Sequence, residues 1–248
     1  APLPTVAGLF DQPTVINNVE SYACAPFILA KGGEWYATLG ASTKNSRGTK
    51  LFSVSGHVNK PGNYEIEFGT TLAELLELAG GIKGGVLKAC VPGGSSVPII
   101  NAESVMKAVI GYEEMSEVKS MVGSGGCMFL NEHTCIVSFI WRTAMFYANE
   151  SCGKCTPCRE GTKWMRQVLE RIVRGNGQPG DKELLLDIAS QIDGRSFCAL
   201  GDAAAWPVAG AIKVFPEEFD YFIKHGKSMV QSPEAKALEP SLEDLVAV

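Results

Sequence analysis

The sequence predicts an α+β protein in which a small ubiquitin-like module is followed by a helical bundle. Between Thr49 and about Asn101, short stretches of alternating apolar residues, separated by turn formers, predict strands around one short helix. From Thr134 onward the apolar residues recur at helical spacing instead. The chain has 248 residues, of which 46% are hydrophobic; this is enough for two or three small domains and excludes a disordered chain.

Residues 1–47 are rich in turn formers, and no repeated strand–helix unit can be made from them. One helix is predicted from about residue 21 to residue 31. Gly32 and Gly33 should end it, because glycine adopts the left-handed conformation that commonly follows a helix. We therefore expect this stretch to be part of a domain and not a complete one.

Residues 48–134 are predicted to form the ubiquitin-like module. Its helix should run from about residue 71 to 79, with Thr70 or Thr71 as N-cap and Glu74 near the capping-box position. Strands are predicted at residues 51–58, 64–68, 88–91 and 97–100, and a glycine turn and another strand within residues 123–134.

Residues 135–226 are predicted to form the helical bundle. Asp181 should cap one of its helices, and Asp202 should cap another that bends near Pro207 and ends near Pro216. Residues 227–248 are acidic and polar, which predicts a surface tail. Apolar residues that follow the third cysteine of the bundle are expected to face its core: Trp164, Met165, Val168, Leu169, Ile172 and Val173.

Charge and hydropathy exclude two classes of partner. The formal net charge of −5 argues against a nucleic-acid-binding protein, which normally carries a basic patch. No uninterrupted apolar run approaches the ~18–20 residues that a membrane-spanning helix needs. We therefore expect a soluble chain that binds no nucleic acid and does not insert into a membrane.

The eight cysteines fall into two groups. Cys152, Cys155 and Cys158 form a C-x2-C-x2-C motif, and Cys198 follows 40 positions after Cys158. A disulfide framework is disfavoured, because such frameworks are typical of short secreted chains and no secretory leader is visible here. The other cysteines stand singly in apolar stretches, where a free cysteine behaves as a small buried hydrophobe: Cys24, Cys90, Cys127 and Cys135.

The triplet points to a metal centre, for which the spacing favours a [4Fe–4S] cluster. Structural zinc sites usually draw their ligands as two pairs, whereas three cysteines at a spacing of three are typical of a ferredoxin loop. Because position 162 is Thr, the fourth ligand must be distant, and Cys198 is the only cysteine downstream. Lys154 and Arg159 add positive charge that favours thiolates. A zinc site, or incidental buried or redox-active cysteines, remain alternatives at this point.

Two segments around these cysteines closely resemble the cluster motifs of the NADH-binding flavoprotein subunit of respiratory complex I. They are Glu150-Ser-Cys-Gly-Lys-Cys-Thr-Pro-Cys-Arg-Glu-Gly161 and Ser196-Phe-Cys-Ala-Leu-Gly-Asp-Ala-Ala-Ala-Trp-Pro207. Gly48-Thr-Lys-Leu-Phe-Ser-Val-Ser-Gly-His-Val-Asn-Lys-Pro-Gly62 resembles the SLBB-type, ubiquitin-like module of that family. Pro13-Thr-Val-Ile-Asn-Asn-Val-Glu20 is similar to the stretch that closes its FMN site.

The resemblance implies electron transfer from NADH through FMN into a chain of iron–sulfur clusters, towards quinone. By position, Cys152, Cys155, Cys158 and Cys198 would be the ligands of the [4Fe–4S] cluster. Asn17 and Asn18 match the pair that contacts the flavin nucleotide, although an Asn-Asn pair is otherwise a common turn former. No catalytic residue is predicted within the chain.

The resemblance also implies partners and a location. The protein would dock against a thioredoxin-like [2Fe–2S] subunit and a large multi-cluster subunit. It would lie in a peripheral arm on the cytoplasmic side of the bacterial inner membrane, or on the matrix side in mitochondria.

The sequence departs from the family in what it lacks. The glycine-rich segment that cradles FMN and admits NADH is not among these residues, nor is the acidic stretch of the nicotinamide pocket. The chain therefore resembles the C-terminal portion of the flavoprotein, with residues 1–47 as the remnant of the FMN/NADH-binding domain. By itself it should hold the cluster but have an incomplete flavin site.

Two other functions compete with this one. A diaphorase subunit of an NAD-linked hydrogenase or formate dehydrogenase would share the cluster motif, but electron-bifurcating relatives often carry further cysteines, and none follows Cys198. The other alternative is a non-catalytic module, in which the SLBB-type region docks a ligand or protein and the cysteines hold structural zinc.

Overall fold

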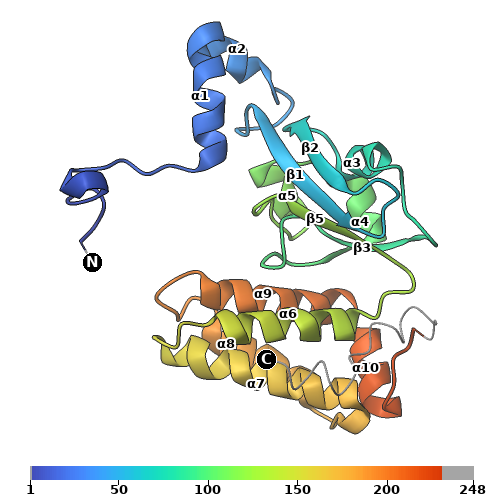
Figure 1. Cartoon of the computed structure of the whole chain (residues 1–248). Coiled ribbons are helices and arrows are strands. Elements are labelled where there is room, and N and C mark those ends of the chain that lie inside the picture. Colours follow the sequence, from blue (N-terminus) through green and yellow to red (C-terminus); the bar gives the residue numbers. More distant parts are fainter. Residues whose placement is uncertain (1, 231–248) are drawn as a thin grey trace.

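The computed structural model of the chain describes residues 2–230 and contains a sheet, a helical bundle and an N-terminal arm. Figure 1 shows the bundle packed beneath the sheet, while the arm extends away from both. This is the α+β architecture that the sequence predicts. The predicted surface tail at residues 227–248 lies, from residue 231 onward, outside the described residues.

The N-terminal arm consists of a short 3-10 turn and two helices. These are η1 (Leu9–Asp11), α1 (Val19–Lys31) and α2 (Gly33–Thr38). The Asn18 side chain caps α1 by accepting from the Glu20 N–H at 2.8 Å. Gly32, at φ +93°, ends the helix as predicted.

One carboxylate fastens the arm to the sheet. Glu20 of α1 accepts from the backbone N–H of Leu51 at 2.7 Å and pairs with the Lys50 ammonium at 2.9 Å. Partial burial by itself would raise the pKa of Glu20, but the Leu51 N–H and Lys50 outweigh it and lower this pKa from its usual value. The start of α1 is thereby held beside β1 (Thr49–Gly56).

The sheet has the strand order β2-β1-β5-β3-β4. The hairpin of β1 and β2 (Gly62–Glu67) is antiparallel, whereas β1 and β5 (Gly126–Asn131) run parallel in the centre. The strand β3 (Leu87–Val91) is antiparallel to β5 and to the edge strand β4 (Ile100–Asn101). A hairpin, a helix and a parallel central pair confirm the ubiquitin-like plan.

The helix α3 (Leu72–Leu78) begins where the sequence predicts. The Thr71 hydroxyl accepts from the Glu74 N–H at 3.1 Å, and the Glu74 carboxylate accepts from the Thr71 N–H at 2.8 Å. This is the predicted capping box, in which two helix-end donors are satisfied reciprocally. Leu72, Leu75 and Leu76 point from this helix into the core of the module.

The module contains two short helices that were not predicted, α4 (Ala102–Lys107) and α5 (Tyr112–Glu117). The strand predicted at residues 97–100 is largely wrong, because only β4 pairs there. Val97 and Ile99, which precede β4, are buried instead in the cluster of the helical bundle. Their alternation reflects contact with the bundle and not a sheet ladder.

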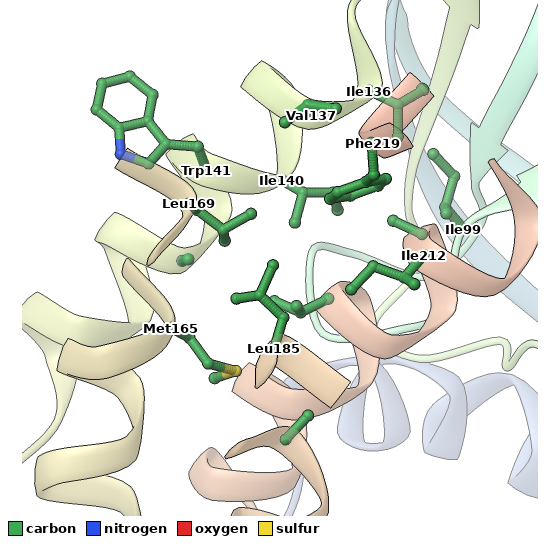
Figure 2. Packing of buried hydrophobic residues seen from close by; sticks show 14 of the residues in the cluster. Ile99, Ile136, Val137, Ile140, Trp141, Met165, Leu169, Leu185, Ile212 and Phe219 are labelled. Carbon is green, nitrogen blue, oxygen red and sulfur yellow. The ribbon is translucent and has the colours of Figure 1, made fainter. Parts of the chain in front are cut away.

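The bundle has five helices within the described residues, with a short π-helical turn after the second. Figure 2 shows how apolar side chains from these helices meet Ile99 of the module in one core. Of the predicted core residues Met165, Leu169 and Ile172 are buried, whereas Trp164 is exposed and that prediction is wrong. The elements are α6 (Ile136–Glu150), α7 (Thr156–Arg171), η2 (Ile172–Asn176), α8 (Asp181–Ile192), α9 (Leu200–Val214) and α10 (Pro216–His225).

The two predicted aspartate caps are wrong. The N-cap of α8 is Gly180; Asp181 is buried and instead pairs with Arg171 and accepts from the Gln178 N–H. The N-cap of α9 is Ala199, and α9 continues through Pro207 before it ends ahead of Pro216. Both carboxylates make tertiary contacts that propensity alone does not reveal.

A buried ion pair joins the sheet to the bundle. Lys88 of β3 contacts Glu218 of α10 at 2.5 Å, and both side chains are largely buried. The second carboxylate oxygen of Glu218 accepts from the Ile136 N–H at the start of α6.

No helix within residues 2–230 is long and apolar enough to cross a membrane.

Candidate metal centre

The cysteine triplet lies where α6 passes into α7. The Ser151 N–H donates to the Tyr147 carbonyl and ends α6 as its C-cap. Cys155 is the N-cap of α7, and Pro157 stands in the first turn, where a missing N–H costs little. Gly153 has φ +76° and so lets the chain reverse within this short connection.

One arginine closes the triplet loop. The Arg159 guanidinium donates to the Gly153 carbonyl at 2.8 Å and to the Thr156 hydroxyl at 3.4 Å. Its Nε also contacts Glu160 at 2.8 Å. These contacts fix the loop from the first turn of α7, so that the three sulfurs are presented by a constrained segment.

The fourth cysteine is carried by the connection between α8 and α9, which folds back onto the triplet loop. The Phe197 N–H donates to the Cys155 sulfur at 3.2 Å. The Lys154 ammonium lies 4.8 Å from the centre of the Phe197 ring, within cation–π range. The neighbour of Cys198 thus contacts the triplet loop across 42 positions of sequence.

Polar contacts hold this second connection in place. The Asp193 carboxylate accepts from the Trp206 indole at 2.9 Å, and the Asp202 carboxylate accepts from the Gly194 N–H at 2.7 Å. A Cβ on Gly201 would collide with the Ser196 side chain, so glycine is needed there for the connection to pack on α9. The loop before Cys198 is therefore tied to α9 at both ends.

The cysteines differ in exposure, and two of them stand at or next to a helix N-terminus. Cys158 is buried, Cys155 is half-buried, and Cys152 and Cys198 are exposed. Cys155 caps α7, and Cys198 directly precedes the N-cap of α9. Helix N-termini carry a partial positive charge that stabilises anions such as thiolates.

The donor set fits an iron–sulfur cluster. Four cysteine sulfurs are the ligands that such clusters use, with backbone N–H groups near sulfur, as Phe197 provides here. In residues 2–230 no three His, Cys, Asp or Glu side chains are gathered closely enough to hold a metal ion, the four cysteines included. The Ser196 hydroxyl, two positions before Cys198, is buried without a partner among the described residues, which leaves a donor available.

Two features of the centre were missed from the sequence. The Ser151 hydroxyl lies 3.3 Å from the Cys158 sulfur, and the Phe197 N–H reaches Cys155. Both contacts depend on where the helices end and how the loops meet. The spacing of the cysteines does not predict either contact. The only hint in the sequence is that Ser151 and Phe197 each stand next to a cysteine.

The predicted nucleotide contacts lie apart from this centre. Asn17 and Asn18 are exposed at the start of α1, in the arm that extends away from the bundle in Figure 1. The Asn18 side chain is engaged as the helix cap. Their role towards FMN stays a prediction.

Comparison with known families matches both parts of the chain. The family described as "NADH-ubiquinone oxidoreductase-F iron-sulfur binding region" matches residues 138–221. The SLBB domain matches residues 50–118. These matches cover the bundle with its cysteines and most of the ubiquitin-like module.

Curated relatives are named as F subunits of NADH-quinone oxidoreductase. The protein of Rickettsia felis is 46% identical over 92% of this chain and 54% of its own length. That of Streptomyces coelicolor is 48% identical over 90% of this chain and 49% of its own. The chain thus spans about half the length of the curated relatives it matches.

Solved structures give the same fold. A chain in the crystal structure of an NAD+-reducing [NiFe]-hydrogenase in the H2-reduced state matches with a TM-score of 0.79 and 31% identity, over 90% of this chain and 37% of that one. The air-oxidised state matches equally well, with a TM-score of 0.79 and 30% identity, over 94% of this chain and 40% of that one. Over the stretch it spans, the chain is similar to NADH-quinone oxidoreductase F subunits, and it contains regions that match the NADH-ubiquinone oxidoreductase-F iron–sulfur binding region and the SLBB domain.

Proposed function

We propose that Cys152, Cys155, Cys158 and Cys198 hold a [4Fe–4S] cluster that transfers electrons. The observation that carries this proposal is the hydrogen bond from the Phe197 N–H to the Cys155 sulfur, because it joins the Cys198 connection to the triplet loop. The family's iron–sulfur binding region, matched at residues 138–221, supports the same assignment.

The chain's own residues orient the sulfurs and set their surroundings. The cluster, when bound, accepts and releases one electron at a time. Arg159 fixes the turn at Gly153, the start of α7 presents Cys155 and Cys158, and the start of α9 presents Cys198. Hydrogen bonds to the sulfurs and the burial of Cys158 would tune the reduction potential.

In the complete protein we propose that electrons come from NADH through FMN and leave towards quinone. The names of the curated relatives support the two ends of this route, NADH and quinone. Asn17 and Asn18 would contact the flavin nucleotide, and residues 1–47 would belong to the FMN/NADH-binding domain. The arm exposes many large apolar side chains, which supports its packing against further polypeptide: Leu3, Leu9, Phe10, Val15, Ile16, Phe27 and Leu29.

The remaining division of the chain is also part of the proposal. Residues 48–134 would form the SLBB-type module, and residues 135–226 the bundle that holds the cluster. We propose a thioredoxin-like [2Fe–2S] subunit and a large multi-cluster subunit as partners, since efficient electron transfer requires a neighbouring cluster. The location would be a peripheral arm at the cytoplasmic face of a bacterial inner membrane or the matrix face in mitochondria.

A diaphorase subunit of an NAD-linked hydrogenase is the second candidate. The similarity to the NAD+-reducing [NiFe]-hydrogenase favours it. The identity of 46–48% to F subunits exceeds the 31% to the hydrogenase chain, which favours the first candidate.

Metal analysis and visible absorption of the anaerobically purified chain test the cluster. We expect a brown protein with iron and acid-labile sulfide in equal amounts, whose broad visible absorption bleaches on reduction. A colourless protein with stoichiometric zinc would support the non-catalytic alternative and contradict the proposal.

A second measurement concerns the flavin. Without the glycine-rich flavin segment, the chain should show little NADH oxidation with an artificial electron acceptor, even with the cluster loaded. Rapid NADH oxidation by the isolated chain would show that its flavin site is complete and would contradict the assignment of residues 1–47.

A further inference from the structure

We infer that Ser151 is a positioning residue that raises the reduction potential of the cluster by donating its hydroxyl proton to the Cys158 sulfur. This inference rests on the proposed function, because it assumes that Cys158 is a cluster ligand. The contact that carries it is the 3.3 Å separation of the Ser151 oxygen and the Cys158 sulfur.

The direction of this hydrogen bond follows from which of the two groups carries a proton when the cluster is bound. The Gly153 N–H points at the Ser151 oxygen from 3.4 Å, and an N–H group can only donate. The oxygen accepts there, which leaves its single proton for the sulfur. A cysteine that ligates iron is a thiolate without a proton, so it can only accept.

The backbone holds Ser151 in position for this role. Its N–H donates to the Tyr147 carbonyl at 3.1 Å and makes it the C-cap of α6. Cys158 is fixed in the first turn of α7, where the Thr162 hydroxyl donates to the Cys158 carbonyl at 2.7 Å. Both residues are therefore held in place through hydrogen bonds to their backbone groups.

Burial makes this contact the most effective side-chain contact at the site. Cys158 is only 7% exposed, whereas Cys152 and Cys198 are exposed to water. A hydrogen bond that is partly shielded from water is electrostatically stronger than one at the surface. One-electron reduction adds negative charge to the sulfurs, so a donor there stabilises the reduced form and raises the potential.

The same helix offers a matched control. At its other end, the Ser138 hydroxyl donates to the Cys135 sulfur at 3.4 Å, and both residues are buried. Cys135 is not a proposed ligand. Ser138→Ala therefore removes a hydrogen bond of the same kind without touching the cluster.

The test is a redox titration of the cluster-loaded chain, in which electron paramagnetic resonance measures the amount of reduced cluster at each potential. Ser151→Ala should shift the midpoint potential to a more negative value with the cluster content unchanged, while Ser151→Thr and Ser138→Ala should match the parent. An unchanged potential in fully loaded Ser151→Ala would overturn the inference and leave the cluster assignment standing. If the parent chain itself holds no cluster, the proposed function fails instead.

A second pair of variants covers the case in which Ser151→Ala does not load its cluster. Ser151→Thr and Ser151→Val have nearly the same shape and differ in the hydroxyl. A more negative midpoint potential of the cluster in Ser151→Val than in Ser151→Thr supports the inference. Equal potentials overturn it.

Discussion

Gly153 is the residue at which the cysteine loop reverses direction. It has φ +76°, and a Cβ there would meet only the Arg159 side chain at 3.7 Å. The obstacle to another residue is thus conformational and not steric.

We expect Gly153→Ala to lower the free energy of unfolding by about 1 kcal/mol, because an L-residue pays that much in the left-handed region. Cluster yield should fall with it. Denaturant unfolding and iron content measure both effects. Gly153→Asn should lower the free energy of unfolding by less, since Asn tolerates this conformation better. An equal decrease for Gly153→Asn and Gly153→Ala would contradict the conformational explanation.

At the scale of single residues, the sequence predicts the triplet and its fourth partner but not their surroundings. The spacing of Cys152, Cys155 and Cys158 is a local pattern, which is why it can be recognised without coordinates. The contacts of Ser151 and Phe197 with sulfur depend on the meeting of two connections. Asp181 and Asp202 fail as caps for the same reason, because distant partners take their carboxylates.

Among the elements, the buried Lys88–Glu218 pair is the main polar link between β3 and α10. The ammonium of Lys88 also donates to the Thr134 carbonyl at 2.6 Å, and Glu218 also accepts from Ile136. Both charges are therefore compensated as long as both residues are present.

We expect Lys88→Met to lower the free energy of unfolding by about 3–5 kcal/mol, because it leaves a buried carboxylate without its cation. The double variant Lys88→Met/Glu218→Leu should lose less than Lys88→Met alone. Chemical denaturation measures the difference. A loss for Lys88→Met as small as that for Lys107→Met, which breaks an exposed pair with Glu103, would contradict this role.

The attachment of α1 to the sheet should weaken in acid. The folded-state pKa of Glu20 is lowered, so its contribution is fully present above the ordinary carboxyl pKa and is lost as the pH falls through the lower folded-state value. Hydrogen exchange of the Leu51 N–H, which donates to Glu20, measures the attachment. Its protection should fall in acid, and Glu20→Gln should show no such pH dependence; an identical acid response in this variant would assign the effect to another group.

The elements with strong local signals are the ones that could be predicted. The α3 helix has a capping box and a leucine face, and the β1–β2 hairpin alternates clearly. The α4 and α5 helices have six residues each, too few to show a helical period, and β4 is a two-residue strand. The register between β1 and β5 joins strands far apart in sequence, so it is fixed only by the packed core.

At the scale of the whole molecule, the residues that precede β1 differ in how closely they contact the module. Residues just before β1 are bound to the module: the Ser46 hydroxyl accepts from the Tyr112 N–H at 2.9 Å, and the Lys44 N–H donates to the Glu114 carboxylate at 2.8 Å. Before Leu39 the arm is largely exposed.

A pair of truncations tests this difference. Removal of residues 1–39 should leave the unfolding transition and the cluster largely unchanged and reduce the binding of a hydrophobic dye. Removal of residues 1–47 should destabilise the module, because the contacts of Ser46 with Tyr112 and of Lys44 with Glu114 are lost. Thermal unfolding of both truncated chains measures this. Equal transitions would show that residues 40–47 do not contribute to the module.

The central claim is that Cys198 and the triplet hold one cluster, and the electron paramagnetic resonance spectrum of the chain with Cys198→Ala tests it most directly. The parent chain and Cys135→Ala, which removes a buried cysteine outside the site, should both show the signal of a reduced [4Fe–4S] cluster. Cys198→Ala should lose this signal or show a three-iron species in the oxidised state. An intact [4Fe–4S] signal in Cys198→Ala would contradict the claim.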